Sequence, residues 1–498
     1  MLLDVVRDHP QRLALDDGRS RRSFAELHRR ALGWAQWLRQ RGLQPGQRLG
    51  LLCGNRVEAV EVVLGGLYAG LWVAPVNWHL TAAELRPLLA GAGLAAVIVE
   101  RRFAGLLPDA GGCHCLEDVA LPAAAGEGPD LDQPAGGIML FTGGTTGIPR
   151  GVQRAQPATL GEQLRRQAAA GRQLGLDGSG PHLVVGPLYH AAPFLFALYD
   201  LYNGATVHIL PRFDALAALQ AIERLGIAHT HFVPTQLVRC LRLPAAQRAA
   251  VDLSSLRLVL HGAAPISPAV KRAMIAWWGP RLVEYWGGTE SGVVTLCDSA
   301  SWLRRPGSVG RPLPHWQVAV LDEDGRALPA GAEGLLYLRH RELARPFRYC
   351  DQPQATADAF REPYGFSLGD YGSVDEAGHV TVVARRSNLI IRGGVNIYPA
   401  EIEAALLEHP AVADAVVFGL DDPEWGSSVN ALVAAGGAAT DGASGGPAAP
   451  SEEGLRAFLA ERLARFKLPQ RIRIVGSIAR NPAGKVGLDA AIRQFRGG

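Results

Sequence analysis

The sequence is poor in cysteine and methionine and has no large excess of charge of one sign. Its 498 residues include 6 cysteines and 3 methionines, and 50 basic residues against 47 acidic ones leave a formal charge of +3. Cysteines scattered through a long chain are typical of reduced thiols rather than of a disulfide framework. Because the basic residues form no cluster, we expect no nucleic-acid partner.

Long hydrophobic runs are also missing. The longest apolar stretches, Val62–Val76 and Ala191–Tyr199, are shorter than the roughly 18 residues that a membrane span needs. Asp4 and Arg7 stand where a signal peptide would place its apolar core. We therefore expect a cytoplasmic protein that is not integral to a membrane.

Apolar runs and amphipathic helices alternate along most of the chain. Ser23–Gly42, for example, combines a serine cap, a glutamate three residues later, helical apolar spacing and a closing glycine. This alternation predicts parallel βαβ units. From Gly310 the strand-like runs are separated by Asp-Gly and Pro-Ala-Gly turns, which favours antiparallel strands.

The length exceeds that of one hydrophobic core and indicates more than one domain. We expect an α/β fold with a large, multi-layer N-terminal domain over residues 1–386, which contains parallel βαβ sheets and a β-barrel-like region. A small, mobile α+β domain is expected over residues 387–498.

One segment, FTGGTTGIPRG at 141–151, combines four glycines with three threonines and one basic residue. Glycine lets the backbone approach a ligand closely, and successive N–H groups can form a nest for an anion such as phosphate. No G-x-x-x-x-G-K-[ST] pattern can be found in it, so it is not a P-loop of the Walker type. Taken alone, the segment fits a flexible turn between a strand and a helix slightly better.

Further motifs follow this loop in a fixed order. They are GPLYHAAP (Gly186–Pro193), HGAAP (His261–Pro265), EYWGGTE (Glu284–Glu290), PGSVGRPLP (Pro306–Pro314), LGDYG (Leu368–Gly372), ARRSNLIIRGGVNIYPAEIE (Ala384–Glu403) and NPAGKV (Asn481–Val486).

In this order and spacing, the motifs resemble those of the adenylate-forming superfamily, which includes acyl-CoA synthetases, nonribosomal adenylation domains and luciferases. The bacterial FadD-type acyl-CoA synthetases are the most similar group. The resemblance implies that the glycine-rich loop holds the β- and γ-phosphates of ATP. Its residues in this role are Thr142, Gly143, Gly144, Thr145, Thr146, Gly147 and Arg150.

The resemblance also implies a catalytic set. Glu290 would be the Mg²⁺ ligand, and Thr289 would donate to the α-phosphate. A single carboxylate that shares Mg²⁺ with phosphate oxygens and water is ordinary coordination for this ion. Lys485 would pair the substrate carboxylate with the α-phosphate, a task suited to a compact charge on a flexible stem.

For the nucleoside, the implied residues lie in four motifs. Trp286 replaces the usual tyrosine beside the adenine, and an indole can still stack. Asp370 would accept the two ribose hydroxyls, and Arg385 would help to hold the sugar. The remaining wall residues are Gly262, Ala263, Ala264, Gly287 and Gly288.

The acyl pocket is expected to contain His190, Phe194, Phe232 and Pro234. A buried core histidine is the alternative for His190. We find no cation near these residues in the sequence that would pair with a second charged group of the acid. We therefore expect an apolar acyl group. The expected passage for CoA is formed by Arg392, Gly393 and Gly394, and the expected hinge of the small domain is Ser387.

The resemblance therefore implies an ATP-dependent acyl-CoA synthetase that activates an apolar acid, whether long-chain, aromatic, steroid or terpenoid. Its partners would be ATP, CoA and the acid, with Mg²⁺ as cofactor, in a monomer or a homodimer. Gly143, Arg150 and Ser387 depart from the family pattern, which leaves the CoA step open. One alternative is an enzyme that only forms acyl-AMP or loads a separate carrier protein. Another is a degenerate, non-catalytic nucleotide- or acyl-binding protein.

Overall fold

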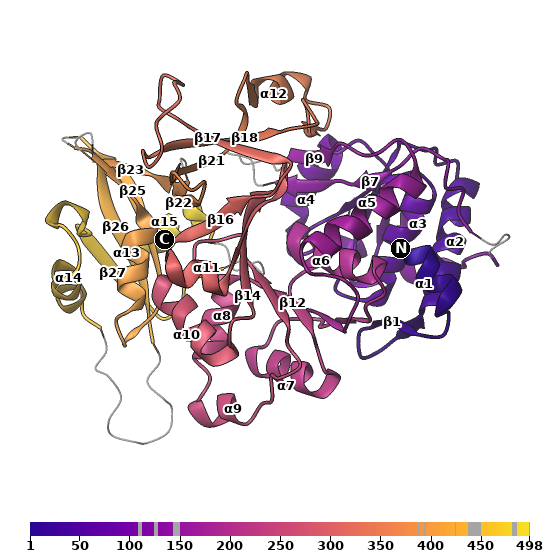
Figure 1. The fold of residues 1–498 in the computed structure, drawn as a ribbon, viewed down its shortest axis with the longest axis horizontal. Helices are drawn as coiled ribbons and strands as arrows, with labels where there is room; N and C mark the ends of the chain where they lie inside the picture. The colour runs from indigo at the N-terminus through magenta and orange to yellow at the C-terminus, as the bar shows by residue number, and fades with distance from the viewer. Residues whose placement is uncertain are drawn as a thin grey trace.

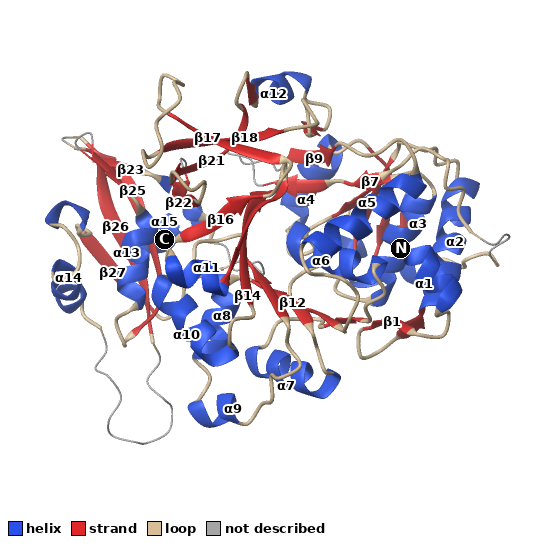
Figure 2. Cartoon of the chain, viewed as in Figure 1, coloured by secondary structure: helices blue, strands red, loops and turns tan. Residues whose placement is uncertain are grey.

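The fold is a mixed α/β architecture with a large N-terminal domain and a small C-terminal domain, shown at the right and left of Figure 1. We analysed a computed structural model, and Figure 2 shows how helices and strands alternate in it. The structure describes residues 1–107, 112–123, 128–142, 150–385, 388–392, 395–423, 425–436, 450–480 and 486–497.

A five-stranded parallel sheet forms one layer near the N-terminus. Its strand order is β6 (Cys113–Cys115), β5 (Leu94–Val99), β3 (Arg48–Leu52), β4 (Trp72–Pro75) and β7 (Gly137–Ile138). The helices α2 (Phe24–Gln40) and α3 (Val57–Tyr68) share one hydrophobic core with the strands of this sheet.

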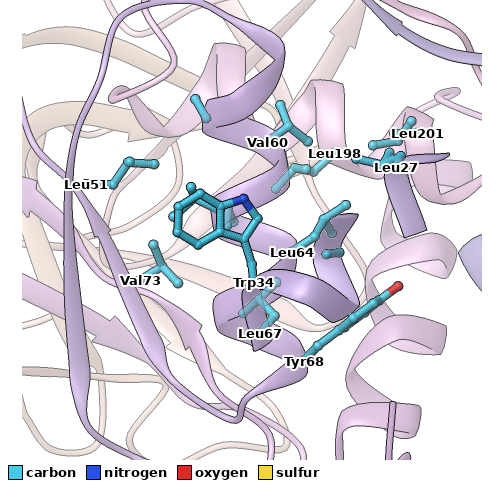
Figure 3. Packing of buried hydrophobic residues seen from close by; sticks show 14 of the residues in the cluster. Leu27, Trp34, Leu51, Val60, Leu64, Leu67, Tyr68, Val73, Leu198 and Leu201 are labelled. Atoms are coloured by element: carbon cyan, nitrogen blue, oxygen red, sulfur yellow. The ribbon is translucent and has the colours of Figure 1, made fainter. Parts of the chain in front are cut away.

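The start of α2 confirms the capping pattern of the sequence. The Ser23 hydroxyl accepts from the Glu26 N–H, and the Glu26 carboxylate accepts from the Ser23 N–H. On the inner face of this helix, Trp34 is 1% exposed and packs among side chains of α3, β3 and β4 (Figure 3). Burial of a large aromatic side chain stabilises a core of this kind by about 2–3 kcal/mol.

A second, 14-stranded sheet is parallel at one end and antiparallel at the other. Its parallel part contains β1 (Leu13–Asp16), β11 (Val207–Ile209), β10 (His182–Val184), β12 (His229–Phe232), β13 (Leu258–His261) and β14 (Leu282–Gly288). The antiparallel part continues through β15 (Gly292–Asp298), β16 (Ser308–Pro312), β22 (Val380–Arg385), β21 (Gly365–Val374), β18 (Gly334–His340) and β17 (Trp316–Leu321). The strands at its margins are β2 (Arg21–Ser23) and β20 (Phe360–Arg361).

Antiparallel pairing thus begins already at β15 and continues past Gly310, where the sequence changes texture. The helices that belong to the parallel part of the sheet are α5 (Leu160–Gln173), α6 (Ala191–Tyr202), α7 (Ala215–Leu225), α8 (Pro234–Leu241) and α10 (Pro268–Trp278). The remaining helices of the large domain are α1 (Leu2–Asp8), α4 (Ala82–Gly91), α9 (Ala245–Ala249), α11 (Ser299–Arg304) and α12 (Pro353–Asp358).

A small antiparallel sheet brings the two ends of the glycine-rich segment together. Its order is β19 (Phe347–Tyr349), β9 (Arg150–Arg154) and β8 (Leu140–Thr142). Thr142 pairs with Arg150 across β8 and β9, so the described ends of the segment lie side by side. Tyr349 pairs with Val152, which places a tyrosine of a distant segment beside them.

The C-terminal domain is an α+β unit with its own sheet and its own hydrophobic cores. Strands β25 (Val412–Asp422) and β26 (Gly426–Ala435) are antiparallel, and β27 (Arg471–Val475) joins β26 in parallel. One core packs sheet residues against α13 (Pro399–Leu407) and α14 (Glu452–Ala460), and another packs them against α15 (Leu488–Arg496). The hairpin of β23 (Ile390–Arg392) and β24 (Val395–Ile397) precedes them.

Hydrogen bonds are among the contacts between this unit and the large domain. The Tyr398 hydroxyl donates to Glu333 at 2.9 Å, and the Arg242 guanidinium donates to the Val412 carbonyl at 3.3 Å. Across the part of the chain that the structure describes, every helix is too short or too polar to cross a lipid bilayer.

Candidate active site

A cavity of about 2030 Å³ opens at the carboxyl ends of the parallel strands. Gly186, Val233 and Ala263 follow the ends of β10, β12 and β13, and all three line it. Ligands of open α/β sheets bind at this edge, because the loops that leave the strands converge there. The β8–β9 hairpin, the antiparallel strands and the C-terminal domain contribute the other walls.

Asp370 lies in this cavity with a protein donor on each carboxylate oxygen. The Trp286 indole N–H donates to Oδ2 at 2.8 Å, and the Arg385 guanidinium donates to Oδ1 at 3.1 Å. Arg385 faces Asp370 because the two residues pair in register across β21 and β22. A carboxylate oxygen can accept more than one hydrogen bond, so Asp370 keeps acceptor capacity toward vicinal hydroxyl groups.

Glu290 lies near the described ends of the glycine-rich segment. Its Oε1 accepts from the Tyr349 hydroxyl at 3.1 Å, and the Arg150 guanidinium lies 5.4 Å from the Tyr349 ring centroid. Burial, together with the negative charge of Glu290, raises the pKa of Tyr349. The tyrosine therefore remains a neutral donor. Thr142 and Thr289 also line the cavity.

This arrangement fits the Mg²⁺ that the sequence implies. Tyr349 holds one oxygen of Glu290 and leaves the second available to a cation. Within the described ranges, no group of three or more His, Cys, Asp or Glu side chains is placed to bind a metal by itself. Mg²⁺ usually takes one or two carboxylates and completes its shell with phosphate oxygens and water, so one glutamate suffices.

The turn after β13 forms another part of the cavity wall. Gly262 has no room for a side chain, because a Cβ there would lie 2.4 Å from the Tyr285 carbonyl oxygen. Ala263 has a φ of 65°, a left-handed conformation that non-glycine residues adopt at a cost in energy. Ala263, Ala264, Gly287 and Gly288 all line the cavity.

A buried ion pair lies behind this wall. Lys271 on α10 is 0% exposed and donates to Glu284 on β14, whose side chain also lines the cavity. Burial of the ammonium group lowers the pKa of Lys271. Sequence analysis missed this pair, since Lys271 lies outside every motif.

The residues expected to form an acyl pocket line the cavity only in part. His190 lines it from the start of α6, with its ring 4.3 Å from that of Tyr189. Phe194 and Phe232 are 1% and 0% exposed and pack in two hydrophobic cores, and Pro234 is also buried. These three residues do not line the cavity, so this part of the prediction is corrected.

The correction follows from side-chain alternation along β12. Phe232 points into the core, whereas its neighbours His231 and Val233 line the cavity. His231 Nε2 lies 3.1 Å from the Tyr285 hydroxyl, and burial lowers the pKa of His231 to about 3, so the ring is neutral. Phe196 completes this aromatic wall, 5.2 Å from the Tyr285 ring.

Several expected residues lie outside the described residues: Gly143, Gly144, Thr145, Thr146, Gly147, Ser387, Gly393, Gly394 and Lys485. Arg480 and Val486, which flank the lysine segment, both line the cavity. Arg392 does not line it, and its guanidinium lies 5.5 Å from the Trp425 ring centroid.

Two family models match the chain. The AMP-binding enzyme model covers residues 2–347, and the AMP-binding enzyme C-terminal domain model covers residues 401–485. The chain is 33% identical to a 2-succinylbenzoate–CoA ligase of Geobacillus kaustophilus, over 96% of this chain and 94% of that protein. It is also 33% identical to the fatty acid–[acyl-carrier-protein] ligase ScoC of Streptomyces coeruleorubidus, over 93% and 90% of the two chains.

A solved structure is similar over the whole fold. It is that of o-succinylbenzoate CoA synthetase from Bacillus subtilis in complex with its acyl-adenylate intermediate. The TM-score is 0.81 and the identity 25%, with 97% of this chain and 96% of that chain covered.

Proposed function

This chain belongs to the AMP-binding enzyme family, and we propose that it is an ATP-dependent acyl-CoA synthetase. A carboxylate oxygen of the acid attacks the α-phosphorus of ATP, which forms acyl-AMP and releases pyrophosphate. The CoA thiolate then attacks the acyl carbon, the bond to the phosphate oxygen breaks, and AMP leaves. The observation that carries this proposal is the placement of Asp370, Trp286 and Glu290 around one cavity.

In this proposal the nucleoside lies between Trp286 and the Ala263 turn, and Asp370 accepts the ribose hydroxyls. The Arg385 guanidinium holds the Asp370 carboxylate in place. The glycine-rich segment binds the β- and γ-phosphates, with Arg150 at its described end. Glu290 holds Mg²⁺, which offsets phosphate charge when it is bound.

Lys485 is proposed to reach between the substrate carboxylate and the α-phosphate, two anions that repel each other. Arg480 and Val486 place the ends of its segment at the cavity. We further propose that residues 1–386 and 387–498 form two domains and that the small one turns at Ser387 between the two half-reactions. Arg392, Gly393 and Gly394 would then face the path of CoA.

The proposed substrate is an acid with a largely apolar, aromatic or bulky acyl group. His190, Phe196 and Tyr285 provide aromatic surface in the cavity, and aromatic surfaces suit such groups. Transfer to a carrier-protein thiol is the second candidate function, and the relative named as an acyl-carrier-protein ligase favours it.

A pyrophosphate-release assay over a panel of carboxylic acids, with and without CoA, tests this function. We expect acid-dependent release from the native protein, with AMP and a CoA thioester as products when CoA is present. The Lys485→Ala variant should lose at least about 100-fold in the rate of acid-dependent release.

The matched control is Lys467→Ala, which removes another cavity lysine that is paired with Glu401 at 2.7 Å. The control should retain most of the activity. Equal losses in both variants would contradict the role of Lys485, and release that no acid stimulates would contradict the function.

A further inference from the structure

Arg154, at the end of β9, faces the cavity. Residues two apart on a strand share a face, and Arg150 and Arg154 both line the cavity. Four residues of strand separate their Cα atoms by about 13 Å. Arg154 therefore meets the cavity at a different point from Arg150, and Val293, next to its neighbour Gly292, packs with Phe196 and Tyr285 of the aromatic wall.

The Arg154 guanidinium has no hydrogen bond or ion pair with any residue that the structure describes, although the residue is half-buried. Its Nη1 lies against Gly292, where a Cβ would come within 2.4 Å. Gly292 begins β15, directly after the turn that carries Glu290. Because a charge that is partly removed from water is costly without a partner, this guanidinium indicates a site for an anion.

Other donors line the same cavity. His340 Nδ1 accepts from the Glu342 and Leu343 N–H groups, at 3.2 and 3.1 Å, which leaves the ring proton on Nε2. The ring of His315 lies 5.2 Å from that of His340, and both line the cavity together with Arg166.

In this part of the cavity, the positive charge comes from arginines and not from the imidazole rings. Burial lowers the pKa of His340 and of His315, and Arg166 adds to this effect while Glu342 opposes it. Glu342 is exposed and does not line the cavity. The wall therefore offers two guanidinium groups and neutral N–H donors.

We propose that Arg154 binds a second carboxylate, at the end of the acyl substrate remote from the one that is activated. The substrate class is then a dicarboxylic acid with an aromatic or apolar body, rather than the uniformly apolar acid that the sequence suggests. A guanidinium suits this role because its planar fork binds both oxygens of a carboxylate. This inference rests on the proposed function.

The test compares 4-phenylbutyrate with its three ring-carboxylated derivatives, in which the second carboxylate is ortho, meta or para. Pyrophosphate release gives kcat/KM, mass spectrometry identifies the product, and calorimetry measures binding of each acid without turnover. In the native protein at least one diacid should exceed the monoacid by about tenfold or more in kcat/KM and in affinity.

The Arg154→Gln variant should remove this preference, and Arg154→Lys should restore part of it because it keeps the charge without the fork. Arg348→Gln is the matched control. Arg348 lies on the paired strand β19, outside the cavity lining, and donates to Gln153 on the other face of β9. The control should keep the diacid preference.

A native preference for the monoacid, or equal losses for both acids in Arg154→Gln, would overturn the inference. Calorimetry separates it from the proposed function. If no acid releases pyrophosphate, the proposed function fails. Tighter diacid binding that depends on Arg154 would still support the site, and equal binding of both acids would refute it.

Discussion

The Trp286 indole and the Asp370 carboxylate form a 2.8 Å hydrogen bond that links β14 to β21 in the wall of the cavity. Asp370 is 7% exposed, so the indole N–H satisfies one oxygen of a nearly buried carboxylate and fixes the plane of the ring. The residue expected to stack on adenine therefore also positions the residue expected to hold the ribose.

Trp286→Phe keeps an aromatic face but removes this hydrogen bond. A hydrogen bond to a charged group contributes about 1.5–3 kcal/mol. We expect KM for ATP to rise by about tenfold, with a smaller change in kcat. Asp370→Ala should cost more, because it removes the acceptor itself. Steady-state kinetics with varied ATP measure both variants, and an unchanged KM for ATP in Trp286→Phe would contradict the role of the pair.

Tyr349→Phe removes the donor that holds Glu290. The glutamate should then bind Mg²⁺ in a less defined position, and the Mg²⁺ concentration for half-maximal activity should rise about three- to tenfold. Glu290→Ala should weaken Mg²⁺-dependent activity more strongly and affect binding of preformed acyl-AMP less. Titration of Mg²⁺ in the pyrophosphate assay separates the two effects. A lower maximal rate at an unchanged Mg²⁺ requirement would speak against this role of Tyr349.

Ala263→Gly should relieve backbone strain in the cavity wall. With a φ of 65°, Ala263 adopts a conformation that glycine adopts freely. Relief of strain and the greater entropy of an unfolded glycine act in opposite directions. We expect the strain term to prevail and the free energy of unfolding to rise by up to about 1 kcal/mol. Urea denaturation measures this, and a loss of stability would show that the entropy of the unfolded glycine outweighs the strain at this position.

The stability of the C-terminal domain depends on pH through Glu403. Burial raises the pKa of Glu403 to about 7, against the opposing effect of the Val417 N–H, which donates to it, and of Arg480. Nearby Asp414, paired with Arg480 at 2.6 Å, adds to the rise. The folded state thus favours the protonated carboxyl group of Glu403.

The contribution of Glu403 to the free energy of unfolding is fully present below about pH 4.5 and is lost as the pH rises through about 7. Relative to the native protein, Glu403→Gln should gain stability between pH 5 and pH 8, by at most about 3 kcal/mol. Urea denaturation at several pH values measures this difference. A difference that does not vary with pH would contradict the shift.

Sequence analysis could propose the site residues that lie within local motifs. Glu290 and Asp370 could be proposed because each lies within a short pattern, and the register of β21 and β22 then places Arg385 opposite Asp370. The helix at Ser23 could be predicted because its capping residues are neighbours in the chain.

Contacts between distant segments could not be predicted in this way. Tyr349 meets Glu290, and Lys271 meets Glu284, only because the sheets bring separate strands and helices together. Phe232 was expected in the cavity, but the alternation of side chains along β12 turns it into the core. Arg154 carries no sequence signal that distinguishes it from an exposed basic residue.

The most direct test of the central claim follows an oxygen atom. With an acid labelled with ¹⁸O in both carboxylate oxygens, together with ATP and CoA, the proposed reaction leaves one labelled oxygen in AMP after the acyl–oxygen bond breaks. Mass spectrometry of the AMP should therefore show a gain of one ¹⁸O for each thioester formed. Thioester formation with unlabelled AMP, or with the label in free phosphate, would contradict an acyl-adenylate path.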